Sequence, residues 1–148
     1  MKKLMFILAS CMLISSCATN TSFNSFYQDH QKDSDFSFGL NSSLVASLLP
    51  DEDLQEIKPL LKKAKHVRIL IFSEEYDRKS DQFNRFIERS KFEKVVKVKD
   101  DEDGIAFFTL EDKDRIKEMV LEISTGDELV LVGLKTNMTQ NQLNEIIQ

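Results

Sequence analysis

Residues 66–72 read HVRILIF, and this stretch decides the fold class. After His66, every residue of this stretch is apolar except Arg68. A nearly continuous apolar run of this length is typical of a strand buried on both faces, in the middle of a sheet. We therefore place a central strand here and interpret the rest of the chain outward from it.

Two segments downstream carry apolar residues at the spacing of an amphipathic helix. They are about 78–90, with Phe83, Phe86, Ile87 and Ser90 in its stripe, and about 113–124, with Ile116, Met119, Val120 and Ile123. Gly126 is expected to end the second helix. Residues 129–134, LVLVGL, then predict a second strongly apolar strand.

A β-hairpin is predicted between these two helices. Residues 96–99 alternate valine with lysine, and residues 105–110 are apolar on both faces. A three-residue loop at 102–104, with Gly104 at positive φ, would pair Val98 with Phe108 and Val96 with Leu110. We prefer it to a two-residue loop at 103–104 because it brings four apolar side chains together.

Strand, helix, strand, strand, helix, strand over about 66–134 is the order of a ferredoxin-like βαββαβ core, which predicts an α+β fold with an antiparallel sheet. The Ile69 and Phe107 strands would be central. The Val96 strand would lie at an edge, where lysines discourage pairing with other sheets. The strand at 129–134 would form the opposite edge, with the short strand at 36–39 as its available cover.

Further elements are expected on both sides of this core. The sequence predicts helices at about 23–31, from Asn41 or Ser42 to Leu49, and from Pro59 to about 64. Thr139 to Gln142 form a capping box that opens a C-terminal helix with Leu143, Ile146 and Ile147 on one side. The N-terminal helices or this last helix would have to cover the sheet face opposite the two crossover helices.

The N-terminus predicts a lipoprotein signal peptide over residues 1–16. Lys2 and Lys3 precede an apolar run that is too short to span a membrane, and the run ends in LISSC at 13–17. This ending resembles the bacterial lipobox, so Cys17 is the expected lipid anchor; Cys11 fits the pattern less well. We expect a lipidated tether at 17–25 and a single α+β domain at 26–148.

Composition excludes several classes of function. The chain has 148 residues, with 20 basic and 25 acidic side chains and a pI near 5.1, so it lacks the basic surface that nucleic acid requires. Both cysteines lie in or next to the signal, which excludes thiol catalysis and disulfides in the mature domain. Catalytic and phosphate-binding motifs are absent from the sequence. We expect no enzyme activity and no cofactor.

Other candidate sites have simpler interpretations. The acidic run at 100–104 lacks the spacing of a calcium-binding loop and suits a solvated hairpin tip. His30, Asp33 and Asp35 are too few for a metal site, and His66 suits a strand entry. Residues 74–77 could contact a ligand at the end of the central strand, or begin a helix whose dipole their acids complement. The aromatics at 23, 26, 36 and 38 are expected to be core residues.

The chain resembles the family called domain of unknown function 4252. The resemblance rests on the lipobox Cys17, the Phe23-Phe26-Tyr27 start, the strand at 65–70, the Asp103-Gly104 hairpin and the strand at 129–134. The resemblance implies a small bacterial envelope lipoprotein with a loose link to envelope signalling. Cys17 is the one functional residue that carries over.

These observations predict a non-catalytic outer-membrane lipoprotein that acts as a protein-interaction or sensing module in the bacterial envelope. Ala18 after the cysteine favours the outer membrane, and the lack of acids at 18–21 favours a domain facing the periplasm. The expected partners are the membrane, through the lipid on Cys17, and another envelope protein. The alternative is a small-ligand-binding lipoprotein with a pocket between the sheet and the N-terminal helices.

Overall fold

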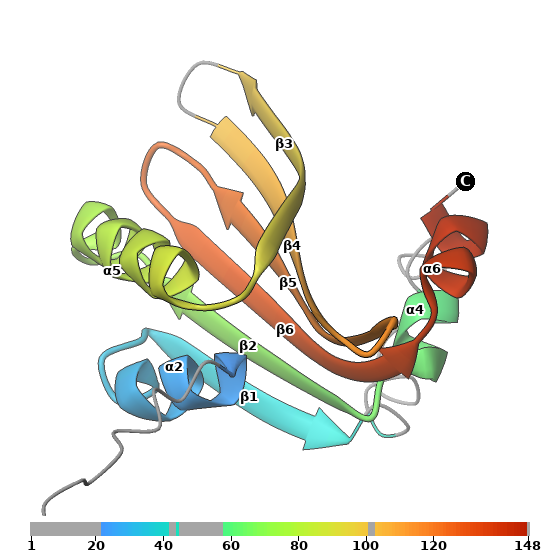
Figure 1. Ribbon diagram of the computed structural model, residues 1–148. Helices are drawn as coiled ribbons and strands as arrows, with labels where there is room; N and C mark the ends of the chain where they lie inside the picture. Colours follow the sequence, from blue (N-terminus) through green and yellow to red (C-terminus); the bar gives the residue numbers. More distant parts are fainter. Residues whose placement is uncertain (1–21, 42–43, 45–57, 101–102, 148) are drawn as a thin grey trace, which may run out of the picture.

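The computed structural model describes residues 22–41, 44, 58–100 and 103–147, and shows a curved sheet with helices on both faces (Figure 1). The strands are β1 (Phe36–Asn41), β2 (His66–Phe72), β3 (Glu93–Asp100), β4 (Asp103–Asp112), β5 (Arg115–Ser124) and β6 (Leu129–Met138). The helices are α2 (Phe23–His30), α4 (Lys58–Lys63), α5 (Tyr76–Arg89) and α6 (Gln140–Ile147). The strands lie in the order β1-β2-β6-β5-β4-β3, and every neighbouring pair is antiparallel. The predicted α+β class with an antiparallel sheet is confirmed.

The predicted ferredoxin-like order is wrong, because residues 115–124 form strand β5 rather than a helix. β5 lies between β6 and β4, so α5 is the one crossover helix in the described part of the chain. A two-residue turn joins β4 to β5, and its residues Lys113 and Asp114 have φ angles of 51° and 60°, as a type I′ turn requires. β1 pairs with β2 and leaves β6 in the interior, so the expectation that the strand at 36–39 covers 129–134 is also wrong.

The helical spacing within 113–124 has a different cause. A β-bulge opposite Leu110 and Glu111 of β4 adds Lys117 to β5 and shifts its alternation. Ile116 and Met119 therefore lie on one face although they are three residues apart, while Val120 packs on the other face. A bulged strand that is apolar on both faces thus mimics the stripe of an amphipathic helix, and Gly126 follows a strand instead of ending a helix.

The β3–β4 hairpin forms with a register that neither predicted loop gives. Val98 pairs with Ile105 and Val96 with Phe107, so Gly104 lies within β4, and residues 101 and 102 between the two strands lie outside the described residues. β5, which the sequence interpretation lacked, decides this register. Pairing with β5 directs Ala106 and Phe108 of β4 toward α5, so Val96 follows Phe107 to the opposite face.

Several local predictions are confirmed. α2, α4 and α5 form where helical spacing placed them, and β3 is an edge strand while β2 and β4 are interior. The capping box opens α6 reciprocally: the Thr139 amide donates to Gln142 Oε1 at 2.9 Å, and the Gln142 amide donates to Thr139 Oγ1 at 3.2 Å. Of the helix predicted from Asn41 or Ser42 to Leu49, only Asn41 and Leu44 are among the described residues, and Asn41 ends β1.

Two hydrophobic clusters lie on opposite sides of the sheet. The larger one is enclosed by α2 and α5, and we call the sheet face beneath these helices the closed face. Phe83 of α5 contributes the ring at its centre, with Phe26 and Phe108 edge-on at centroid distances of 5.5 and 5.7 Å. The smaller cluster lies under α4 and α6 at one end of the other face (Figure 1).

Candidate functional site

The sheet face opposite α2 and α5 carries two cross-strand rows of apolar side chains. The register aligns Phe36, Ile71, Val130, Ile123 and Ile105 in the first row, and Phe38, Ile69, Val132, Leu121, Phe107 and Val96 in the second. We call these residues the open face. All of them are at least partly exposed, and Phe36, Ile105 and Val96 are about half exposed, at 50%, 48% and 48%.

The next row on the same face shows the effect of a cover. It contains Val67 and Met119, and helices α4 and α6 pack over it at one end of the sheet (Figure 1). Val67 is 1% exposed and Met119 is fully buried. The second row of the open face touches this cluster through Ile69 and Val132. Within the described ranges, no helix or strand lies over the first row.

A polar cleft of about 390 Å³ lies on the closed face, between α5 and the corner formed by β3, β4 and β5. Glu122 of β5 forms part of its floor, and Lys94 and Lys97 of β3 line the far wall. Gly104 and Ala106 of β4 lie between the lysines and the glutamate, and their small size leaves the space open. Ser80, Asn84 and Ser124 add hydrogen-bonding groups to the lining.

Glu122 is only 9% exposed, and no described residue donates a hydrogen bond to its carboxylate. Burial raises the pKa of Glu122, and the attraction of Lys97 and then Lys94 partly opposes this increase. The attraction of the two lysines therefore offsets only part of the cost of burying the Glu122 carboxylate. A ligand with a positively charged group would supply what the protein does not.

A smaller cleft of about 210 Å³ lies where α2 meets the sheet. The backbone amide of Phe23 donates a hydrogen bond to Glu118 Oε2 at 2.8 Å, and Phe23 itself packs against Gly133. Burial raises the pKa of Glu118, against the hydrogen bond from Phe23, which lowers it. Arg68 also lines this cleft and lies 5.0 Å from the ring centroid of Tyr27. These contacts fix the N-terminus of α2 to the sheet.

Comparison with known families adds one finding. The family model described as Domain of unknown function (DUF4252) matches residues 27–146. The chain belongs to this family. No curated protein and no solved structure matches the chain. None of the helices within the described ranges is long and apolar enough to cross a membrane.

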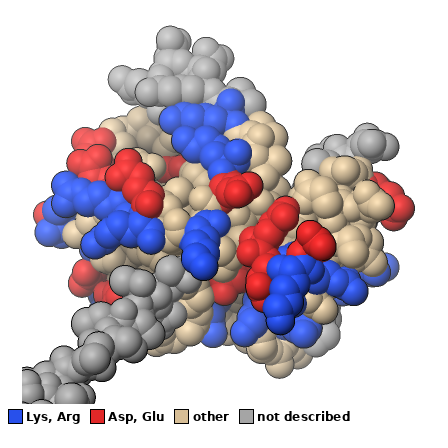
Figure 2. Space-filling model, viewed as in Figure 1, with Lys and Arg blue, Asp and Glu red and all other residues tan. Residues whose placement is uncertain are grey.

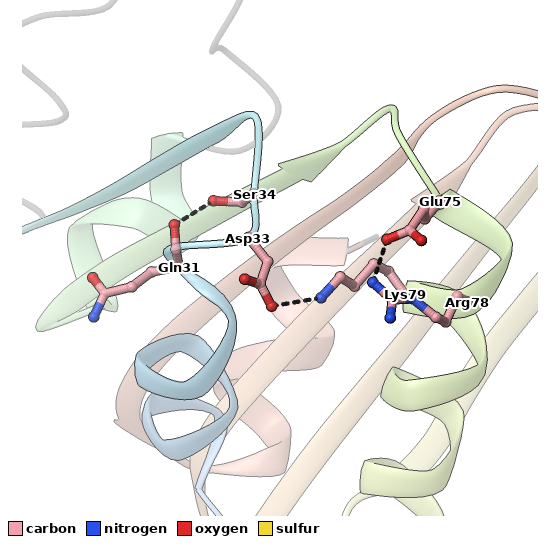
Figure 3. Close-up of polar contacts among 6 residues, drawn as sticks. All are labelled: Gln31, Asp33, Ser34, Glu75, Arg78 and Lys79. Carbon is pink, nitrogen blue, oxygen red and sulfur yellow. Dashed lines mark hydrogen bonds and ion pairs between the residues drawn. The ribbon is translucent and has the colours of Figure 1, made fainter.

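In this DUF4252 domain, two of the residues considered for a metal site, Asp33 and Asp35, tie neighbouring elements together instead, and Figure 3 shows the contact of Asp33. Asp33 Oδ2 accepts a hydrogen bond from Lys79 Nζ at 3.0 Å, and Lys79 is only 2% exposed. Asp35 Oδ2 accepts from the Ser73 amide at 2.5 Å. The described residues contain no group of three metal-ligating side chains. Asp33 and Asp35 thus tie the turn between α2 and β1 to α5 and to the end of β2.

The other predicted candidates fall in different places. Glu75 pairs with Arg78 at the start of α5, where Asp77 occupies the first turn and, with Tyr76, lines the 390 Å³ cleft. His66 begins β2 and lines the smaller cleft. Cys17 and Cys11 lie outside the described residues, as do Asp101 and Glu102 of the acidic run.

The expectation that four aromatics are core residues holds for two of them. Phe23 and Phe26 are 3% and 4% exposed in the closed core. Phe36 is half exposed and Phe38 partly exposed, and their stacked rings belong to the open face. The expected cover of this face is confirmed for α4 and α6 at one end of the sheet, whereas α2 packs on the same face as α5 and leaves Phe36 half exposed.

Sequence reasoning missed Glu118 and Glu122 because it placed both in a helix with a solvated polar side. The available signal was their spacing of four, which in a strand puts two acids on one sheet face. Elsewhere the surface is ordinary: Figure 2 shows acidic and basic side chains interspersed on the side in view.

Proposed function

We propose that this protein is a non-catalytic outer-membrane lipoprotein whose open face binds another protein of the bacterial envelope, as an interaction or sensing module. The single observation that supports this is the pair of partly exposed apolar rows across the sheet, the first of which no described helix or strand covers. Contiguous apolar surface of this extent marks an interaction site in a soluble domain. A partner that covered the first row would bury Phe36 and Ile105, which are now about half exposed.

The proposed anchor suits this role. Five residues separate Cys17 from Phe23, the first residue of α2, and a fully extended tether of five residues spans at most about 18 Å. The lipid on Cys17 would therefore hold the domain close to the membrane. Because α2 packs on the closed face, the tether joins the side of the domain that bears α2 and leaves the open face for a partner.

The partner's chemistry follows from the open face. Its residues are valine, isoleucine, leucine and phenylalanine without a charged side chain among them. We propose a protein that presents an uncharged apolar strip, such as one side of an amphipathic helix or sheet. A surface rich in acidic or basic groups would lose solvation here without gaining a counter-charge.

Site-specific photocrosslinking in intact cells tests this proposal. A photoreactive residue at Ile71 or Val130 lies in the first row, and Arg85, exposed on α5, is the matched control position on the closed side. We expect one protein to be crosslinked from both open-face positions and not from Arg85. The crosslink should disappear when Phe36→Ser and Ile105→Ser are combined and persist with Arg85→Ser.

Other crosslinking results would contradict the proposal. Crosslinks within the chain to residues 45–57 would assign the open face to the protein's own segment, and a crosslinked dimer would assign it to a second copy.

A Cys17→Ala variant tests the anchor separately. Palmitate labelling that survives this change would overturn the lipid attachment. Loss of the crosslinked partner would show that its capture depends on membrane position.

A further inference from the structure

Four charged side chains line the 390 Å³ cleft without an ion pair to a described residue: Glu122, Lys94, Lys97 and the exposed Asp77. Glu122 accepts no hydrogen bond from a described residue, and Lys94 and Lys97 form no ion pair with one. Lys94 instead lies 5.6 Å from the ring centroid of Phe108. On α5, by contrast, Lys79 is paired with Asp33. The cleft therefore presents two negative and two positive groups to a ligand, and Glu122 is the buried one of the four.

The register fixes how far apart the backbone positions of Glu122 and Lys97 lie. Glu122 pairs with Ala106, and Ala106 pairs with Lys97, so the glutamate and the lysine share one cross-strand row two strands apart. Neighbouring strands are about 4.8 Å apart, which separates these two backbone positions by about 10 Å. Ala106 between them is too small to fill the gap.

We propose that this cleft binds a short peptide in its zwitterionic form, with the terminal ammonium group at Glu122 and the terminal carboxylate at Lys97 and Lys94. An extended tripeptide spans about 10 Å, whereas a single amino acid spans about 3.5 Å and reaches one end only. The cleft volume of about 390 Å³ suits a ligand of this size. Ser80, Asn84 and Ser124 are placed along the walls to hydrogen-bond the peptide amides.

This site lies on the closed face, so it is independent of partner binding at the open face. It also moves the predicted ligand pocket from the N-terminal helices to α5. α2 is packed with Phe23, Phe26 and Tyr27 at 3%, 4% and 6% exposure, and it leaves only the smaller cleft.

A purely structural role for Glu122 gives the opposite expectation for its neutral variant. If the carboxylate of Glu122 stabilised the fold, replacing it should lower the stability, because the groups bonded to it would be left without a partner. A carboxylate kept for a ligand has no such partners, so Glu122→Gln should leave the melting temperature unchanged or raise it. The matched control is Glu88→Gln, an exposed acid on α5 outside the cleft.

Calorimetric titration of the full-length protein with trialanine tests the proposal directly. We expect saturable binding, weakened at least ~10-fold, or ~1.4 kcal/mol, for N-acetyl-trialanine and for trialanine amide, which each lack one charge. Glu122→Gln should weaken trialanine by a similar factor and acetylated trialanine no further, while Glu88→Gln binds as the wild type does. Absence of trialanine binding, or equal binding of the blocked peptides to the wild type, would overturn the proposal even if Glu122→Gln did not fold.

Discussion

The two faces of the sheet are built from the same strands and the same residue types, yet they are buried to different degrees. Leu70, Leu131 and Val120 on the closed face are fully buried. Their chain neighbours Ile71, Val130 and Leu121 are equally apolar and remain partly exposed on the open face. The helices above the sheet make this difference, because strand alternation only assigns a residue to a face. Hydrophobicity in a strand therefore predicts a surface to be covered, not what covers it.

The energetic contrast between the faces is correspondingly large. Full burial of a large apolar side chain contributes about 1.5–3 kcal/mol relative to exposure in water. On the closed face, packing against α2 and α5 already contributes this free energy to folding. On the open face, part of it becomes available only when another surface covers the exposed side chains. Substitutions on the closed face should therefore affect stability, and those on the open face should affect binding.

The largest expected effect is loss of the central ring on the closed face. Phe83 is fully buried, so Phe83→Ala should reduce the free energy of unfolding by about 3–5 kcal/mol. Phe36→Ala, the same change on the open face, should cost less than about 1 kcal/mol because Phe36 is half exposed. Urea unfolding measures both variants. Equal losses would show that the open face is buried in the isolated protein.

A smaller loss is expected where α2 meets the closed face. A Cβ at Gly133 would lie 2.0 Å from the Phe23 ring, so Gly133→Ala must displace α2. We expect a loss of about 1–3 kcal/mol in unfolding free energy, typical of overpacking. Gly39→Ala is the control, because its Cβ would meet the mobile end of Arg68 at 3.0 Å. A Gly133→Ala variant as stable as Gly39→Ala would contradict the packing of Phe23.

The pH dependence of stability tests the buried glutamates of the closed face. Burial raises the pKa of Glu118 and Glu122, so the folded state binds protons more tightly than the unfolded state does. Stability should therefore rise as pH falls from neutral toward the ordinary glutamate pKa of about 4.3. The Glu118→Gln/Glu122→Gln variant should show a flatter profile over this range.

Asp33 and Asp35 act in the opposite direction. Hydrogen bonding by Lys79 lowers the pKa of Asp33, and the Ser73 amide lowers that of Asp35. The stability that they contribute is present at higher pH and is lost as pH falls below the ordinary aspartate pKa of about 3.9. The two effects thus occupy separate pH ranges. Chemical denaturation at several pH values between neutral and about 4.3 measures the glutamate effect. Parallel curves of unfolding free energy against pH for the wild type and the Glu118→Gln/Glu122→Gln variant would exclude it.

The smallest change in stability is expected at the rim of the open face. Ile105→Thr should alter the unfolding free energy by about 0.5 kcal/mol or less, because Ile105 is 48% exposed. It should nevertheless reduce binding of a fluorescent apolar dye such as anilinonaphthalene sulfonate. Arg85→Ser on α5 should change neither quantity. Unchanged dye fluorescence in Ile105→Thr would show that the dye, and by extension an apolar partner, does not use this face.

Local signals in the sequence predicted most of the elements. The apolar run at 66–72, the stripe on α5, the Thr139–Gln142 capping box and the lysines of β3 each gave the right element in the right role. These signals succeed because they depend on neighbours within a few residues. The prediction for residues 115–124 failed because a bulge, which forms in the pairing of β5 with β4, changed the alternation of the strand.

The candidate sites were less predictable for the same reason. Phe36 and Ile105 are 69 positions apart in the sequence, and five strands align them in one row. Glu122 became a buried acid in a cleft because β3 and α5 enclose it and Gly104 and Ala106 leave space beside it. None of these relations is visible in a local pattern.

The sequence by itself determined the α+β class, the antiparallel strands, the helix caps and the expected lipid signal at Cys17, because apolar periodicity, capping chemistry and the lipobox pattern act over short distances. Only the tertiary structure decided the strand order, the hairpin register and which apolar face is covered. Those features depend on which distant segments pack together. The free energy of that packing is a property of the pair of elements in contact, so neither segment's own sequence specifies it.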